Sequence, residues 1–256
     1  MCIISDELIS SKLKQTKDLM KKIVEVEEEI ERQYPRQNIK TPVHLCIGQE
    51  IVPAMISPYL TDKDYIVSNH RSHGHAIAKG IDINAFWYEL YGNDKGCCNG
   101  KGGSMHMADM SKGIIPTSAI VGAGLAIACG TAYSQKLDGN GHVTVCYFGD
   151  GAVDEGIFWE SVNFAILHKL PILFAYEDNH VGSGTTKPYR RHFSSEEAID
   201  AMFGGQYLKF LKDDDIHWTS GWMNIAIDGL RKGCGPYLAR FDVDRLCPHV
   251  GPREVK

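Results

Sequence analysis

The 256-residue sequence lacks a long hydrophobic run and lacks a block of charges of one sign. No apolar stretch reaches the roughly 20 residues that a membrane-spanning helix needs. The polar, charged segment 1–32 has no apolar core of the kind that signal peptides carry. We therefore expect a soluble, cytoplasmic protein with no membrane partner. The 27 basic and 32 acidic residues give a net charge of −5 without a basic cluster, which argues against nucleic acid as a partner.

The eight cysteines include no C-x-x-C pair, the spacing that is typical of zinc and redox sites. Several stand in apolar runs, as Cys146 does within residues 143–148, and this context predicts buried free thiols. Internal repeats and low-complexity tracts are also absent. A chain of this length that is 43% hydrophobic suits one large domain or two small ones.

Two continuous apolar runs, residues 143–148 and 171–176, are rich in β-branched and aromatic side chains. Such runs are typical of strands buried on both faces of a parallel sheet. Residues 155–169 between them have helical spacing, which completes a βαβ unit. Helices are also predicted at residues 6–33, 48–59, 84–91, 121–137 and 224–231, a late strand at 237–243, and loops at 70–74, 92–113 and 182–197, the last of them mobile.

These elements predict an α/β fold in which helices flank a parallel sheet. Residues 1–42 are interpreted as an N-terminal helix and linker, and residues 43–256 as the α/β domain. The Gly/Ala-rich segment that begins at Gly122 has no G-x-x-G continuation after a strand, so a dinucleotide site is not expected there.

Polar residues follow both buried strands. Gly149, Asp150 and Gly151 come directly after the first, and Asn179 follows the second. Because a crossover brings adjacent parallel strands to one carboxyl edge, we expect Asp150 and Asn179 to be neighbours. Their oxygens suit Mg²⁺, and free backbone N–H groups at the start of the next helix suit a diphosphate.

A Gly-Asp-Gly turn by itself is weakly specific, but the spacing adds weight. Twenty-six residues, 152–177, separate Gly151 from Asp178. The pattern is similar to the thiamine-diphosphate signature, which begins Gly-Asp-Gly and ends Asn-Asn at that separation. Here Asp178 replaces the first Asn, and Asn179 is kept.

Four further segments, 44–50 (HLCIGQE), 70–74 (HRSHG), 100–107 (GKGGSMHM) and 245–249 (RLCPH), resemble alpha subunits of 2-oxoacid dehydrogenase E1 enzymes that act on pyruvate, acetoin or branched-chain substrates. The resemblance covers residues 43–251 and implies the thiamine-diphosphate-binding fold. The chain ends at Lys256, soon after His249, whereas these alpha subunits usually continue, so we expect a short, divergent member.

The resemblance also implies the site. Thiamine diphosphate and Mg²⁺ are the implied cofactors, and His70 stands where the family has a Tyr. The implied metal ligands are Asp150 and Asn179 by their side chains and Val181 by its carbonyl. The implied cofactor contacts are His70 and Arg71 near the diphosphate, backbone donors at Gly151 and Ala152, main-chain groups of Ala119 and Val121 beside the aminopyrimidine, and His249. The implied catalytic residues are His44 and His249.

The implied activity is cleavage of a C–C bond next to the carbonyl of a 2-oxoacid or acyloin. In the family the aminopyrimidine contacts a Glu of the beta subunit, which implies an α₂β₂ heterotetramer and an inactive isolated chain. A lipoyl acyltransferase is a further candidate partner. The alternatives are the N-terminal half of a split transketolase, which the 100–107 segment and the Arg71 loop disfavour, and a specialised biosynthetic thiamine-diphosphate enzyme.

Overall fold

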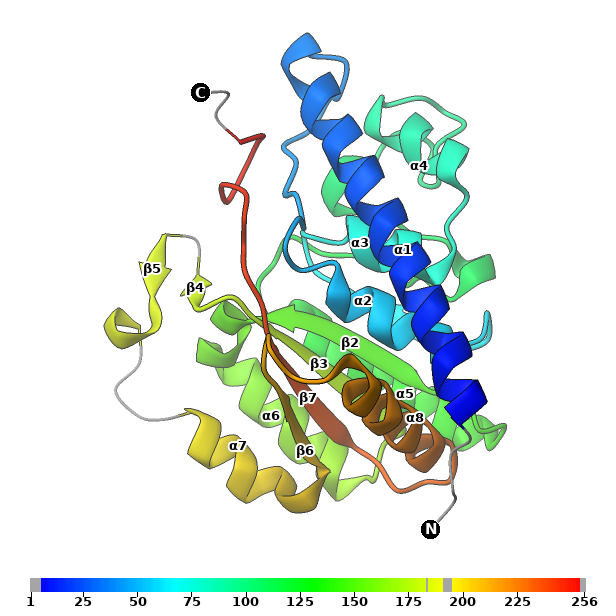
Figure 1. Cartoon of the computed structure of the whole chain (residues 1–256), viewed down its shortest axis with the longest axis vertical. Helices are drawn as coiled ribbons and strands as arrows, with labels where there is room; N and C mark the ends of the chain where they lie inside the picture. The colour runs from blue at the N-terminus through cyan, green and yellow to red at the C-terminus, as the bar shows by residue number, and fades with distance from the viewer. Residues whose placement is uncertain (1–5, 183, 191–194, 254–256) are drawn as a thin grey trace. The chain divides into compact units, whose positions relative to one another are not determined.

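The computed structural model describes residues 6–182, 184–190 and 195–253. The chain divides into two compact units. Unit 1 comprises residues 1–63, 68–119 and 244–256, and unit 2 comprises residues 64–67 and 120–243. The main sheet belongs to unit 2, and the long N-terminal helix belongs to unit 1 (Figure 1).

Unit 2 is built on a five-stranded parallel sheet in the order β1-β2-β3-β7-β6. The strands are β1 (Tyr65–Val67), β2 (Thr144–Gly149), β3 (Ile172–Asp178), β6 (Tyr207–Phe210) and β7 (Tyr237–Asp242). Every residue of β3, and every residue of β2 except its last, is buried. This burial on both faces confirms the prediction from the two apolar runs, because a parallel sheet is covered on each side.

Helices cover both faces of this sheet. The rings of Phe148 on β2 and Phe174 on β3 contact each other, so they share a face. Phe148 also contacts Phe158 of α6 (Gly156–Leu167), and Phe174 contacts Phe203 of α7 (Ser195–Phe203). Helix α5 (Ala123–Asp138) packs beside α6, whereas α8 (Ile216–Arg231) lies on the opposite face, in front of the sheet in Figure 1.

Unit 1 is helical within its described residues. Helix α1 (Asp6–Gln33) has the predicted bounds and packs against α2 (Ile51–Ile56) and α3 (His73–Lys79), and α4 (Ile83–Leu90) follows. A buried chain of polar contacts links these parts. Glu27 Oε1 lies 2.6 Å from His73 Nδ1, and His73 Nε2 lies 2.7 Å from Ser104 Oγ. All three side chains are fully buried, so these contacts hold α1 to α3, and a substrate cannot reach them.

The glycine-rich segment 92–113 is irregular apart from two short 3-10 turns, Gly103–Met105 and Met110–Lys112, in agreement with the predicted loop. It folds around the buried carboxylate of Glu89. Four backbone N–H groups donate to this carboxylate at 2.7 to 3.0 Å, those of Cys98, Gly100, Gly102 and Gly103. Gly100 has φ +71°, and a Cβ there would lie 2.5 Å from the carbonyl carbon of Gly92, which explains the need for glycine.

Several elements differ from the predictions. Strands β1 and β6 were not predicted, since β1 has three residues and β6 has four. Helix α7 was also not predicted. Helix α8 begins at Ile216 rather than residue 224, because Asp215 caps it by accepting from the His217 N–H at 2.7 Å and Gly221 is tolerated inside the helix. His73 and Gly74 begin α3 rather than lying in a loop. The domain boundary at residue 42 stays a prediction.

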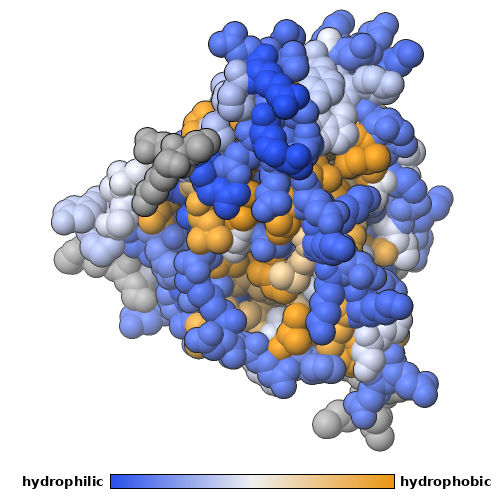
Figure 2. Space-filling model, turned by 45° about the horizontal axis from the view of Figure 1, so that its top comes forward, coloured by the Kyte–Doolittle hydropathy of each residue, from blue (hydrophilic) through white to orange (hydrophobic). Residues whose placement is uncertain are grey.

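The predicted mobile segment 182–197 lies partly outside the described residues. Its described part contains Gly182 of strand β4 (Val181–Gly182), strand β5 (Thr185–Thr186), a 3-10 turn at Lys187–Tyr189 and the start of α7. No helix among residues 6–182, 184–190 and 195–253 is long and apolar enough to cross a membrane. The face in Figure 2 is mainly hydrophilic, and polar side chains interrupt its hydrophobic patches.

Candidate functional site

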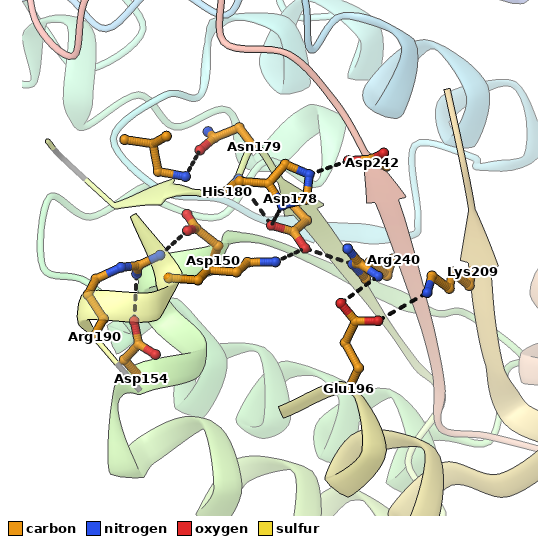
Figure 3. A network of polar contacts seen from close by, with 12 residues as sticks. Asp150, Asp154, Asp178, Asn179, His180, Arg190, Glu196, Lys209, Arg240 and Asp242 are labelled. Atoms are coloured by element: carbon orange, nitrogen blue, oxygen red, sulfur yellow. Dashed lines mark hydrogen bonds and ion pairs between the residues drawn. The ribbon is translucent and has the colours of Figure 1, made fainter. Parts of the chain in front are cut away.

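The carboxyl edge of the unit 2 sheet brings together the polar residues that follow β2 and β3. The two strands are parallel neighbours, and Gly149 is paired with Glu177. Asp150 and Asn179 therefore leave adjacent strands at the same edge, as the crossover argument predicts (Figure 3). Asp150 is 2% exposed and begins a 3-10 turn, Asp150–Asp154, that leads into α6.

The carboxylate of Asp150 is paired with a cation from the same unit. The guanidinium of Arg190 donates to Asp150 and also lies 2.5 Å from Asp154 (Figure 3). A Cβ on Gly182 would come within 2.6 Å of Arg190 Nη1, so a side chain at this position would displace the guanidinium from its present place. The pairing shows that the edge formed by Asp150 and Asp154 attracts positive charge.

The turn after β3 presents oxygen atoms at the same edge. Asn179 Oδ1 accepts a hydrogen bond from the Val181 N–H at 3.1 Å, and His180 takes a left-handed conformation with φ +64°. Asp150, Asn179 and Val181 supply a carboxylate, an amide oxygen and a main-chain carbonyl. These are the donor types that Mg²⁺ accepts, so the residues fit a magnesium site, whose occupancy stays a prediction.

Asp178, which departs from the thiamine-diphosphate signature, is fully buried at the centre of an ion-pair network (Figure 3). Its Oδ2 accepts from Arg240 Nε at 2.7 Å and from the Lys187 ammonium. Its Oδ1 accepts from the His180 N–H at 3.1 Å, and the His180 ring lies 2.5 Å from Asp242. Burial alone would raise the pKa of Asp178, but Lys187, Arg240 and His180 lower it. The carboxylate is therefore charged and fixes the start of the Asn179 turn.

Three of the predicted residues form a histidine cluster in unit 1. The ring centroids are 4.7 Å apart for His44 and His70, 5.1 Å for His44 and His249, and 5.6 Å for His70 and His249. Beside them the Arg71 guanidinium donates to the carbonyl of Leu45 and, at 3.5 Å, to that of His249. A diphosphate contact of Arg71 stays a prediction.

The cluster disfavours protonated imidazoles. Burial, followed by the charges of His70 and Arg71, lowers the pKa of His44 to about 3. Burial and Arg71 lower the pKa of His70 to about 4, and burial with Arg71 and Arg245 lowers that of His249. The imidazole of His44 is therefore neutral at physiological pH, because a buried site beside a guanidinium opposes a second positive charge.

The predicted site residues are divided between the two units. His44, His70, Arg71, Ala119 and His249 belong to unit 1, and the other predicted residues to unit 2. Ala119 is half-buried, and 48% of Val121 is exposed. The site residues in unit 2 are Val121, Asp150, Gly151, Ala152, Asn179 and Val181.

A model of the dehydrogenase E1 component family matches residues 18–249. The chain belongs to this family. The alpha subunit of acetoin:2,6-dichlorophenolindophenol oxidoreductase from Cupriavidus necator is 38% identical over 90% of this chain and 69% of its own length. That of Bacillus subtilis is 39% identical over 77% of this chain and 59% of its length. The mitochondrial pyruvate dehydrogenase E1 component subunit alpha of Dictyostelium discoideum is 33% identical over 84% of this chain and 56% of its length.

This family member also resembles solved transketolases. The enzyme of Campylobacter jejuni matches 94% of the chain and 38% of its own with a TM-score of 0.59 at 19% identity. That of Leishmania mexicana matches 88% and 36% with a TM-score of 0.61 at 16% identity. At such identities the likeness establishes the fold alone, and it confirms the predicted α/β thiamine-diphosphate-binding fold. The sequence resemblance to E1 alpha subunits is confirmed by the family and its relatives.

Two features with buried carboxylates were missed by the sequence analysis. Glu89 was read as part of an ordinary helix, although it organises segment 92–113. Arg240 and Lys187 were not connected with Asp178. The available signal was Asp178 itself, since a carboxylate placed in a buried strand needs a cation as a partner.

Proposed function

We propose that this chain is the alpha subunit of a cytoplasmic thiamine-diphosphate-dependent dehydrogenase that cleaves the C–C bond next to the carbonyl of a 2-oxoacid or an acyloin. Membership in the dehydrogenase E1 component family supports the cofactor and the class of reaction. The acetoin and pyruvate enzymes among the relatives support the two substrate classes. The chain spans 56–69% of the length of these three relatives, so the activity of the complete enzyme is part of the proposal.

The observation that carries the proposal is the meeting of Asp150 and Asn179 at one sheet edge. In this proposal Asp150, Asn179 and the Val181 carbonyl hold Mg²⁺, which neutralises the diphosphate. Backbone N–H groups of Gly151 and Ala152 add donors to the same anion. Bound thiamine diphosphate would supply a nucleophilic carbon and an electron sink for the cleavage of a bond next to a carbonyl.

In this proposal His44 and His249 orient the substrate and do not donate protons. Because the pKa of His44 is lowered to about 3, its imidazole is neutral at physiological pH. A neutral imidazole donates one hydrogen bond and accepts another, which suits orientation of a polar substrate. We assign this role to His44 and His249, whose Nδ1 atoms are both buried without a hydrogen-bond partner.

The decisive experiment compares two carboxylates that contact the same guanidinium. Asp150→Ala removes the proposed Mg²⁺ ligand, and Asp154→Ala is the matched control, because Asp154 also pairs with Arg190. Calorimetric titration with thiamine diphosphate in the presence of Mg²⁺ should show binding lost in the first variant and kept within about threefold in the second. Equal binding by wild type and Asp150→Ala would refute the assignment.

A partner subunit is the second part of the proposal. Unit 2 exposes apolar side chains on α5 and α6: Leu137 and Leu167 are each 71% exposed, and the rings of Tyr133 and Phe164 are in contact. Exposed apolar groups of this kind favour burial against another protein. We propose that a beta subunit completes the enzyme as an α₂β₂ heterotetramer, with a lipoyl acyltransferase as a further partner.

Reconstitution tests this part. The purified chain should show no turnover of pyruvate or acetoin with 2,6-dichlorophenolindophenol as electron acceptor, and addition of the beta subunit should restore it. Turnover by the chain alone would contradict the need for a partner. Comparison of the two substrates in the reconstituted enzyme then assigns the substrate class.

A further inference from the structure

In the described part of unit 1, two clusters each bring together three side chains of metal-ligating types. One consists of His44, His70 and His249, and the other of Glu89, Cys97 and Cys98. In each, one ligand atom per residue lies within 4.8 Å of the other two. Their chemistry differs, and the difference decides which cluster is suited to a cation.

The Glu89 cluster is unsuited to a metal ion. Both carboxylate oxygens of Glu89 already accept two backbone N–H groups each. Burial raises the pKa of the Cys97 thiol to about 12, and burial and Glu89 raise that of Cys98. Since a thiol binds metal as the thiolate, this cluster would have to lose two protons and break a set of hydrogen bonds.

The histidine cluster has the opposite properties. The three rings meet edge to face at interplanar angles of 64–78°, and one ring nitrogen of each histidine lies within 4.8 Å of the other two. His44 is 6% exposed, and its Nδ1, like that of His249, is buried without a hydrogen-bond partner. Neutral imidazole is the form that binds metal, and the lowered pKa values of all three histidines keep them neutral.

The cluster is also held in place by the backbone of unit 1. The Gly251 N–H donates to the Val43 carbonyl at 2.9 Å, and the Leu246 N–H donates to the Ile47 carbonyl at 3.2 Å. These bonds tie the segment of His249 to that of His44. Arg71, next to His70 in the chain, donates to the carbonyls of Leu45 and His249 and joins the third segment to both.

We infer that His44, His70 and His249 form a three-imidazole site for a divalent transition cation, with Zn²⁺ as the best-suited ion. Zn–N bonds of about 2.0–2.1 Å at tetrahedral angles place ligand nitrogens about 3.4 Å apart. The nitrogens, all within 4.8 Å of one another, reach that spacing by small side-chain rotations. Three protein ligands leave the fourth position to water or an anion. The positive charge of the Arg71 guanidinium repels the ion and therefore favours an anion, rather than water, as its fourth ligand.

The ion would occupy the imidazoles of His44 and His249, to which the proposed function gives a role in substrate orientation. Zn²⁺ is therefore expected to inhibit the assembled enzyme, and Mg²⁺, which prefers oxygen ligands, is not expected to bind there. The binding test uses neither cofactor nor substrate, so its outcome is independent of that proposed function.

The test is titration of the purified chain with Zn²⁺ by calorimetry and with Co²⁺ by visible absorption. We expect one ion per chain and intense tetrahedral Co²⁺ bands without the near-ultraviolet charge-transfer band of a Co–thiolate bond. His70→Gln and His44→Gln should each weaken Zn²⁺ binding at least about tenfold. His217→Gln, which removes an exposed histidine of α8, is the matched control and should bind as wild type does.

His249→Gln serves as a further ligand variant if circular dichroism shows that one of the other two is misfolded. Undiminished Zn²⁺ binding by a folded ligand variant would overturn the inference. A Co–thiolate band, or failure of the wild-type chain to bind one Zn²⁺, would overturn it as well.

Discussion

Replacement of Asp178 by asparagine tests how this chain supports its departure from the thiamine-diphosphate signature. The substitution restores the residue that the signature carries and keeps the side-chain volume. It also removes a fully buried negative charge to which Arg240 Nε and the Lys187 ammonium donate. We therefore expect the signature-like residue to destabilise this protein.

The magnitude follows from the partners that remain. Removal of one member of a buried ion pair typically costs about 3–5 kcal/mol, because the other charge stays buried without compensation. Arg240 keeps Glu196 at 2.9 Å, and the Lys187 side chain is 21% exposed and can regain water. We expect a loss of about 3 kcal/mol in the free energy of unfolding, or roughly 6–12 °C in melting temperature if the whole chain unfolds together.

Thermal and urea unfolding measure the effect. Asp200→Asn, which changes an exposed residue of α7 in the same way, should stay within about 0.5 kcal/mol of wild type. In the Asp178→Asn background, Lys187→Met should lower the free energy of unfolding by about 1–2 kcal/mol less than it does in the wild type. This difference is the coupling energy of the two side chains. If Asp178→Asn unfolds within about 1 kcal/mol of wild type, the reasoning about this network is refuted.

The other predictions concern the glycine-rich segment and the thiols. Glu89→Gln replaces one carboxylate oxygen by an NH2 group, which leaves two of the four backbone N–H groups without an acceptor. We therefore expect a loss of at least about 3 kcal/mol in the free energy of unfolding and faster tryptic cleavage at Lys101. An unchanged cleavage rate, with exposed Glu160→Gln as control, would contradict this. Burial raises the pKa of Cys97 to about 12, so about one thiol in 10,000 is a thiolate at pH 8. Peptide mass spectrometry after reaction with iodoacetamide should show exposed Cys234 labelled at least about 50-fold faster than Cys97. Equal labelling rates would disprove the burial argument.

The strongest periodic elements were predictable from the sequence because local composition decides them. Helix α1 has the predicted bounds, since residues 6–33 are free of glycine and proline. Strands β2 and β3 follow from continuous β-branched and aromatic runs. The polar residues that follow the two strands, together with the parallel crossover, were sufficient to place Asp150 and Asn179 at one edge.

Short elements and buried charges depended on contacts distant in the sequence. Strand β1 has three residues and is a strand because it pairs with β2, almost 80 residues later. Asp178 meets Arg240, 62 residues away, only because β3 and β7 are neighbours in the sheet. The local sequence does not predict such a partner, because the order of the strands in the sheet determines which cation lies beside a buried carboxylate.

By itself, the sequence determined the type of the long elements, the edge at which the oxygen ligands lie and the family resemblance, because periodicity, strand ends and motif spacing are properties of the linear chain. Only the tertiary structure decided the protonation of the histidines and the partners of the buried carboxylates. Burial and the charges of non-local neighbours determine both: the pKa of His44 falls to about 3 among His70, Arg71 and His249, and Glu89 is compensated by a loop that the chain folds back over it.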